Sequence, residues 1–163
     1  AYANLAGAKL MQGDLESALK AVENANKHNP TGEVKNTLNA VKGYDAILKG
    51  DYENAVRAFT SAGNNAVVRY NKALANLLNK DFSNAQSGFK SAIQADEKLA
   101  LAYYCAAITA AKQGKAAEVG SNLKEAFKRG GDMKVRGKTL KERATDDLEF
   151  LDFREKPEFK DAF

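Results

Sequence analysis

The chain has 163 residues, of which 44% are hydrophobic and 28% charged, and its net charge is +4. These proportions are those of a folded globular protein, and no apolar run approaches the ~18 residues of a membrane-spanning helix. A single cysteine excludes an internal disulfide, and a single histidine excludes a His and Cys cluster for a transition metal. The small basic excess is only a weak indication of an acidic partner.

The first residues already follow a helical pattern, with Tyr2, Leu5 and Leu10 on one apolar face. Neither a capping residue nor an initiator methionine nor a signal peptide precedes this pattern. We therefore expect the chain to be a segment of a longer protein.

A short phrase then recurs between helical stretches. It reads Gly-Asp-Leu-Glu-Ser-Ala at 13–18, Gly-Asp-Tyr-Glu-Asn-Ala at 50–55, Lys-Asp-Phe-Ser-Asn-Ala at 80–85, and Gly-Lys-Ala-Ala-Glu-Val at 114–119. Successive phrases begin 37, 30 and 34 residues apart. A helix–turn–helix unit repeated at this period predicts an α-solenoid, a stacked array of helix pairs.

Each position of the phrase has a structural role. The opening glycines suit the left-handed conformation that ends a helix, and the aspartates that follow suit the N-cap of the next helix. Four residues after the phrase comes a larger apolar side chain, which we expect to fill the space between neighbouring helices. These side chains are Val22, Phe59, Phe89 and Leu123.

The pattern predicts eight helices, paired as 1–12 with 15–28, 35–48 with 52–62, 66–79 with 82–95, and 99–113 with 116–129. The four repeats then cover 1–30, 31–63, 64–97 and 98–129. Beyond a helix stop at 130–131, Thr139 to Glu142 form a capping-box pattern that predicts a ninth helix, and Pro157 suits the first turn of a last one. Four of the eight phenylalanines lie in the last fourteen residues. We therefore expect residues 130–163 to cap the array.

This pattern resembles the tetratricopeptide repeat, with its consensus of W-x2-L-G-x2-Y, then A-x3-F, then P. The second helices carry the match, in Ala18/Val22/Pro30, Ala55/Phe59, Ala85/Phe89 and Val119/Leu123. The first helices match less well, because the second and third repeats put Asn39 and Arg69 in the aromatic column and Lys42 and Lys72 in the leucine column. The resemblance covers residues 1–129 and implies an all-α, right-handed solenoid. The phrasing is most similar to repeat segments of cell-envelope proteins of the Bacteroidetes, which implies a bacterial source and favours the periplasm or outer membrane over the cytoplasm.

In this family the first helix of each pair lines the concave surface, where peptides or partner helices bind. The resemblance therefore implies a non-enzymatic scaffold for protein–protein interaction. The alternative is a structural spacer in a larger cell-envelope protein, without a strong ligand of its own. The residues expected on the binding surface are Tyr44, Ile47, Tyr70, Asn71, Leu74, Tyr104, Ile108 and Lys112.

The types of these residues indicate what would bind. Tyrosine offers a large ring with one polar tip, and the amide of Asn71 suits a peptide backbone. Lys112 is the one cation of the set, which argues against the family's carboxylate clamp and favours an amphipathic helix or an apolar peptide. The alternative reading is that the tyrosines only pack between adjacent helices.

No residue pattern predicts catalysis or a cofactor. His28 sits at a helix end, where it is expected to act as a helix-end cation, and Cys105 sits in mid-helix as a small buried side chain. Residues 124–143 carry a local charge of +5, but residues 144–163 follow with −4. Nucleic acid is therefore not the expected partner.

Overall fold

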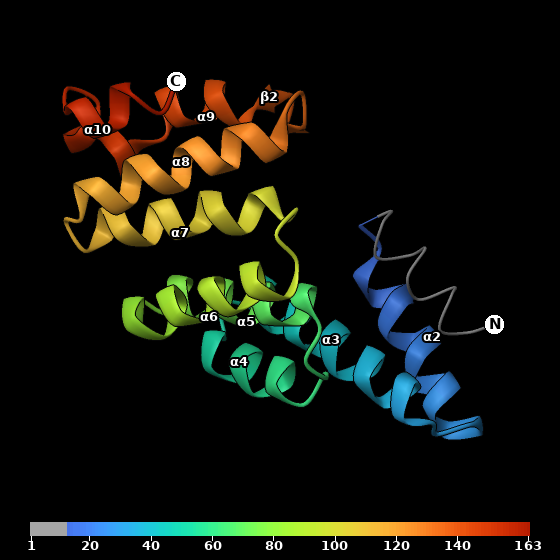
Figure 1. Cartoon of the computed structure of the whole chain (residues 1–163). Coiled ribbons are helices and arrows are strands. Elements are labelled where there is room, and N and C mark those ends of the chain that lie inside the picture. Colours follow the sequence, from blue (N-terminus) through green and yellow to red (C-terminus); the bar gives the residue numbers. More distant parts are fainter. Residues whose placement is uncertain (1–12) are drawn as a thin grey trace. The chain divides into compact units, whose positions relative to one another are not determined.

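The structure, a computed structural model, describes residues 13–163 (Figure 1). The helix predicted over 1–12 lies outside the described residues. The chain divides into two compact units, Ala1–Asn79 and Lys80–Phe163, which we call unit 1 and unit 2.

Unit 1 consists of helices α2 (Leu15–His28), α3 (Gly32–Leu48), α4 (Tyr52–Thr60) and α5 (Ala66–Leu78). The bounds of α2 are those predicted. Helix α3 begins three residues before the predicted start, because the side chain of Thr31 accepts a hydrogen bond from the Val34 N–H and caps the helix there. Helices α4 and α5 end two residues and one residue earlier than expected.

Unit 2 begins with α6 (Phe82–Ala95), α7 (Ala100–Lys112) and α8 (Ala116–Gly130). A hairpin of β1 (Lys134–Val135) and β2 (Lys138–Thr139) follows, then α9 (Leu140–Asp146), the 3-10 helix η1 (Leu148–Phe153) and α10 (Pro157–Lys160). The capping box at Thr139 is present, with the Thr139 side chain and Glu142 bonded to each other's backbone N–H. Neither the hairpin nor η1 was expected from the sequence.

The recurring phrase performs the roles predicted for it. Its glycines at 13, 50 and 114 have φ of 76°, 75° and 73°, and Lys80 takes the same left-handed conformation with φ 61°. The aspartates at 14, 51 and 81 each accept a hydrogen bond from the backbone N–H three residues later. The column of larger apolar side chains is fully buried, as expected: Val22, Phe59, Phe89 and Leu123 are 0% exposed.

One glycine sets the spacing between α3 and α4. A Cβ added at Gly43 would lie 2.7 Å from the Phe59 ring, closer than carbon atoms pack. The missing side chain therefore lets the Phe59 ring fill the interior of unit 1, where the Tyr44 ring meets it edge-on at 5.4 Å.

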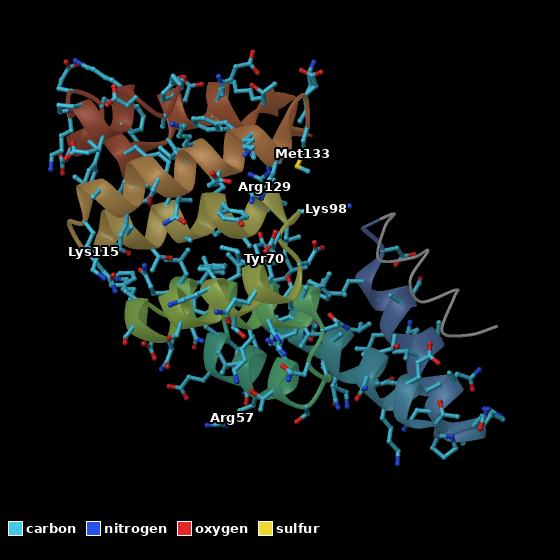
Figure 2. All side chains as sticks on the ribbon, viewed as in Figure 1. Arg57, Tyr70, Lys98, Lys115, Arg129 and Met133 are labelled. Carbon is cyan, nitrogen blue, oxygen red and sulfur yellow. The ribbon has the colours of Figure 1, made fainter. Side chains whose placement is uncertain are left out.

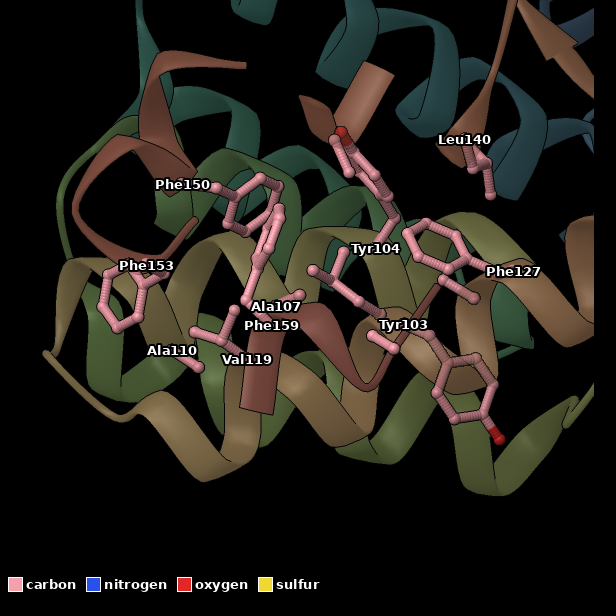
Figure 3. Packing of buried hydrophobic residues seen from close by; sticks show 14 of the residues in the cluster. Tyr103, Tyr104, Ala107, Ala110, Val119, Phe127, Leu140, Phe150, Phe153 and Phe159 are labelled. Atoms are coloured by element: carbon pink, nitrogen blue, oxygen red, sulfur yellow. The ribbon is translucent and has the colours of Figure 1, made fainter. Parts of the chain in front are cut away.

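The expected cap covers α7 and α8 with a cluster of phenylalanines (Figure 3). Phe150 is 0% exposed, and its ring lies 5.9 Å from that of Phe159. Gly120 of α8 is the docking point for α10, because a Cβ there would lie 2.7 Å from the carbonyl carbon of Glu158. The apolar face of the last helix pair is thus closed by the chain's own C-terminal segment, residues 140–163.

Within residues 13–163, none of the helices has the length and apolar character that crossing a bilayer requires. The His, Cys, Asp and Glu side chains of these residues form no group of three or more that could hold a metal ion.

Candidate interaction surface

Helices α3 and α5 are the first helices of the second and third predicted repeats. A polar contact between two of the expected binding residues joins them. The Asn71 side-chain amide on α5 donates a 2.6 Å hydrogen bond to the Tyr44 hydroxyl on α3. Asn71 is 5% exposed, and burial raises the pKa of Tyr44. The amide of Asn71 therefore orients Tyr44, and the Tyr44 ring packs on Phe59 at an interplanar angle of 82°.

The same two helices leave large apolar side chains in solvent. Within the described part of unit 1, the exposed large hydrophobic residues are Leu48 (77%), Val67 (53%) and Leu78 (40%), and all three lie on α3 or α5. Leu48 follows Tyr44 by one helical turn, and Val67, Asn71 and Leu78 are spaced to share one side of α5. We call these three side chains the apolar row.

The remaining expected residues of unit 1 border this row. Ile47 and Leu74 are partly buried, and Ile47 packs against the Phe59 cluster. Tyr70 is also partly buried on α5. The structure therefore brings together Tyr44 and Asn71 by direct contact and places the others on the same pair of helices.

In unit 2, Tyr104 is held by the C-terminal segment. Its hydroxyl donates a 2.5 Å hydrogen bond to Asp147, and its ring meets that of Phe150 edge-on at 5.8 Å (Figure 3). Only 3% of Tyr104 is exposed, and burial together with the Asp147 carboxylate raises its pKa. The hydrogen bond and ring packing make Tyr104 a fastening point for the cap.

The other two expected residues of α7 also face this segment. Lys112 forms an ion pair with Glu149, and Ile108 packs partly buried against the phenylalanine cluster. Tyr104, Ile108 and Lys112 recur at four-residue intervals and so share one face of α7. Their partners Asp147 and Glu149 lie about forty residues further along the chain. No local sequence pattern therefore predicts these contacts.

Residues that the sequence analysis did not assign to a functional site contribute to packing and helix ends. His28 hydrogen-bonds through Nδ1 to the carbonyl of Asn24 at the end of α2, and Cys105 is buried. The Arg129 guanidinium lies 4.5 Å from the centre of the Tyr103 ring, so part of the basic stretch packs on α7 (Figure 2).

No protein-family model matches the chain, and no curated protein matches it. The crystal structure of MamA is similar over 96% of this chain and 91% of its own, with a TM-score of 0.67 and 17% identity. The complex of the TPR2AB domain of yeast Sti1 with pHSP90 is similar over 99% of this chain and 68% of that one, with a TM-score of 0.57 and 17% identity.

The chain has a tetratricopeptide-like fold. Both neighbours contain tetratricopeptide repeats, and within each unit the described helices α2 to α5 and α6 to α8 pack in sequence order, each against the next. The expected all-α, tetratricopeptide-like solenoid is therefore confirmed. At 17% identity the likeness concerns the fold alone.

Proposed function

We propose that this protein is a non-enzymatic scaffold that binds a peptide or partner helix on the first helices of unit 1. One observation carries the proposal: the exposed large apolar side chains of the described part of unit 1 all lie on α3 and α5. Exposed large apolar side chains confined to one pair of helices are what a protein interaction site on those helices would present. The tetratricopeptide-like fold supports the same reading, since one structural neighbour was determined in complex with pHSP90.

The pairing of Tyr44 with Asn71 would serve this surface by holding it rigid. A side chain fixed before binding loses less conformational entropy when the partner arrives. Tyr44, Ile47, Tyr70, Asn71 and Leu74 then form the support on which the apolar row is presented. An amphipathic helix with apolar residues at i, i+3 and i+7 matches such a row.

The three expected binding residues of unit 2 could contact a ligand only under a further condition. Tyr104 and Lys112 already contact Asp147 and Glu149, so a ligand would reach them only after the C-terminal segment moved aside. We therefore place the primary site in unit 1 and keep Tyr104, Ile108 and Lys112 as a prediction that depends on that movement.

The test is retention of a partner from extracts of the source cell. The bait is the chain carrying Leu48→Asp, Val67→Asp and Leu78→Asp, compared with the unchanged chain. Leu148→Asp is the matched control, because Leu148 is 80% exposed but lies on η1. All these positions are exposed, so circular dichroism should show an unchanged helical content.

A protein retained by the unchanged chain and by Leu148→Asp, but lost by the triple variant, supports the proposal. Equal retention by all three would refute a site on the first helices. If none retains a partner, the alternative of a spacer domain in a larger cell-envelope protein is favoured.

A further inference from the structure

A cavity of about 410 Å³ lies between α4 and α5 in unit 1. Two buried apolar residues, Phe59 and Val68, are among those that line it. Two basic residues, Arg69 and Lys72, also line it, and none of the residues that line it is acidic. The lining of the cavity therefore combines apolar and positively charged residues.

The sequence explains why this space is open. Arg69 and Lys72 occupy the columns that hold a large aromatic residue and a leucine in the tetratricopeptide consensus. An aromatic ring and a leucine would place apolar atoms against Phe59. Long basic side chains instead direct their charged ends to the edge of the space.

The two cations differ in how they are held. The Nε of Arg69 donates to the backbone oxygen and to Oδ1 of Asn64, both at 3.0 Å. Lys72 is partly buried, and within the described chain it takes part in no hydrogen bond or ion pair. A bound anion would give the Lys72 ammonium a charged partner.

We propose that this cavity binds a small organic anion, a carboxylate carried on a short apolar chain or ring. The carboxylate would pair with the Lys72 ammonium, and the apolar part would lie over Val68. The volume falls within the range of about 300–1,000 Å³ that small-molecule sites occupy. The site is separate from the apolar row and adds a ligand of a different class to the proposed scaffold function.

The probe is octanoate, and its neutral counterpart octanamide has the same chain without the charge. Both are titrated into the whole chain by calorimetry, and the methyl resonances of Val68 are followed by NMR. The test variant is Lys72→Gln. The matched control is Lys42→Gln, because Lys42 stands in the same repeat column on α3 but does not line the cavity.

The expected result is that octanoate shifts the Val68 methyl resonances and binds at least about tenfold more tightly than octanamide. Lys72→Gln should weaken octanoate binding by about tenfold, the scale of one charge-assisted hydrogen bond, while Lys42→Gln changes it less than about twofold. Equal affinity for the two probes, equal weakening by the two variants, or no shift of Val68 would each overturn the proposal. Absence of octanoate binding to the unchanged chain would also overturn it.

Discussion

Replacement of Gly120 by alanine should release the C-terminal segment from α8. The new Cβ would overlap the backbone carbonyl of Glu158 and lie 3.1 Å from its Cβ. Backbone atoms cannot turn away as a flexible side chain does, so α10 has to move as a body. Phe159, which is 5% exposed, would lose its burial with it.

The magnitude follows from the contacts of that helix. Exposing a buried phenylalanine costs about 1.5–3 kcal/mol, and losing the ring contacts of Phe159 with Phe150 and Phe163 adds roughly 0.5–1.5 kcal/mol for each pair. Alanine in mid-helix regains about 1 kcal/mol over glycine. The expected net loss in the free energy of unfolding is therefore about 1.5–5 kcal/mol.

Urea unfolding followed by circular dichroism measures the loss, and hydrogen exchange over 148–163 shows whether it is local to the cap. Gly32→Ala is the matched control, since a Cβ at Gly32 would meet no atom within 4 Å. Unchanged stability and exchange in Gly120→Ala would show that α10 is not seated on α8 as described.

Three further perturbations test the repeats. Ala55→Leu or Ala85→Leu places extra carbon atoms at fully buried positions and should lower the free energy of unfolding by about 1–3 kcal/mol in a urea titration; equal stability would mean that the repeat register is wrong. Lys80→Gly should raise that free energy by up to about 1 kcal/mol, because relief of the left-handed strain at φ 61° exceeds the added chain entropy, and a lower melting temperature would contradict this. Hydrogen bonds from the asparagine three residues later lower the pKa values of Asp51 and Asp81, so their capping contribution is complete above about pH 4 and is lost as pH falls through the lowered values. In the double variant Asp51→Asn and Asp81→Asn, helical content measured by circular dichroism should therefore fall less steeply as the pH is lowered below about 4. The same fall as in the unchanged chain would argue against this capping role.

The parts of the fold that depend on neighbouring residues could be predicted from the sequence. Helices α2 and α6 begin and end where the phrase and its apolar periodicity place them, because capping and left-handed termination act over three or four residues. The start of α3 was missed, since Thr31–Gly32 reads equally as a loop or as an N-cap. The hairpin was missed as well, although Arg136 and Gly137, at φ 51° and 81°, form a two-residue turn that the Gly signals.

The candidate site could be predicted only as far as which helix faces carry it. Spacing placed Tyr44 and Asn71 on the first helices, but their hydrogen bond depends on how α3 and α5 pack. The hydrogen bond from Tyr104 to Asp147 depends on the path of the C-terminal segment, which no local sequence pattern specifies. The only sequence feature associated with the cavity is the presence of Arg69 and Lys72 in the aromatic and leucine columns of the consensus.

The way the C-terminal segment closes α7 and α8 limits how this array can be lengthened. A duplicated repeat inserted after α8 would find Tyr104, Lys112 and Gly120 shaped for the segment instead of for another helix pair. New copies of the repeat fit only before α7. Helices α7 and α8 and the C-terminal segment then stay together at the end of the lengthened array. An engineered longer version should therefore keep residues 100–163 intact as its terminal block.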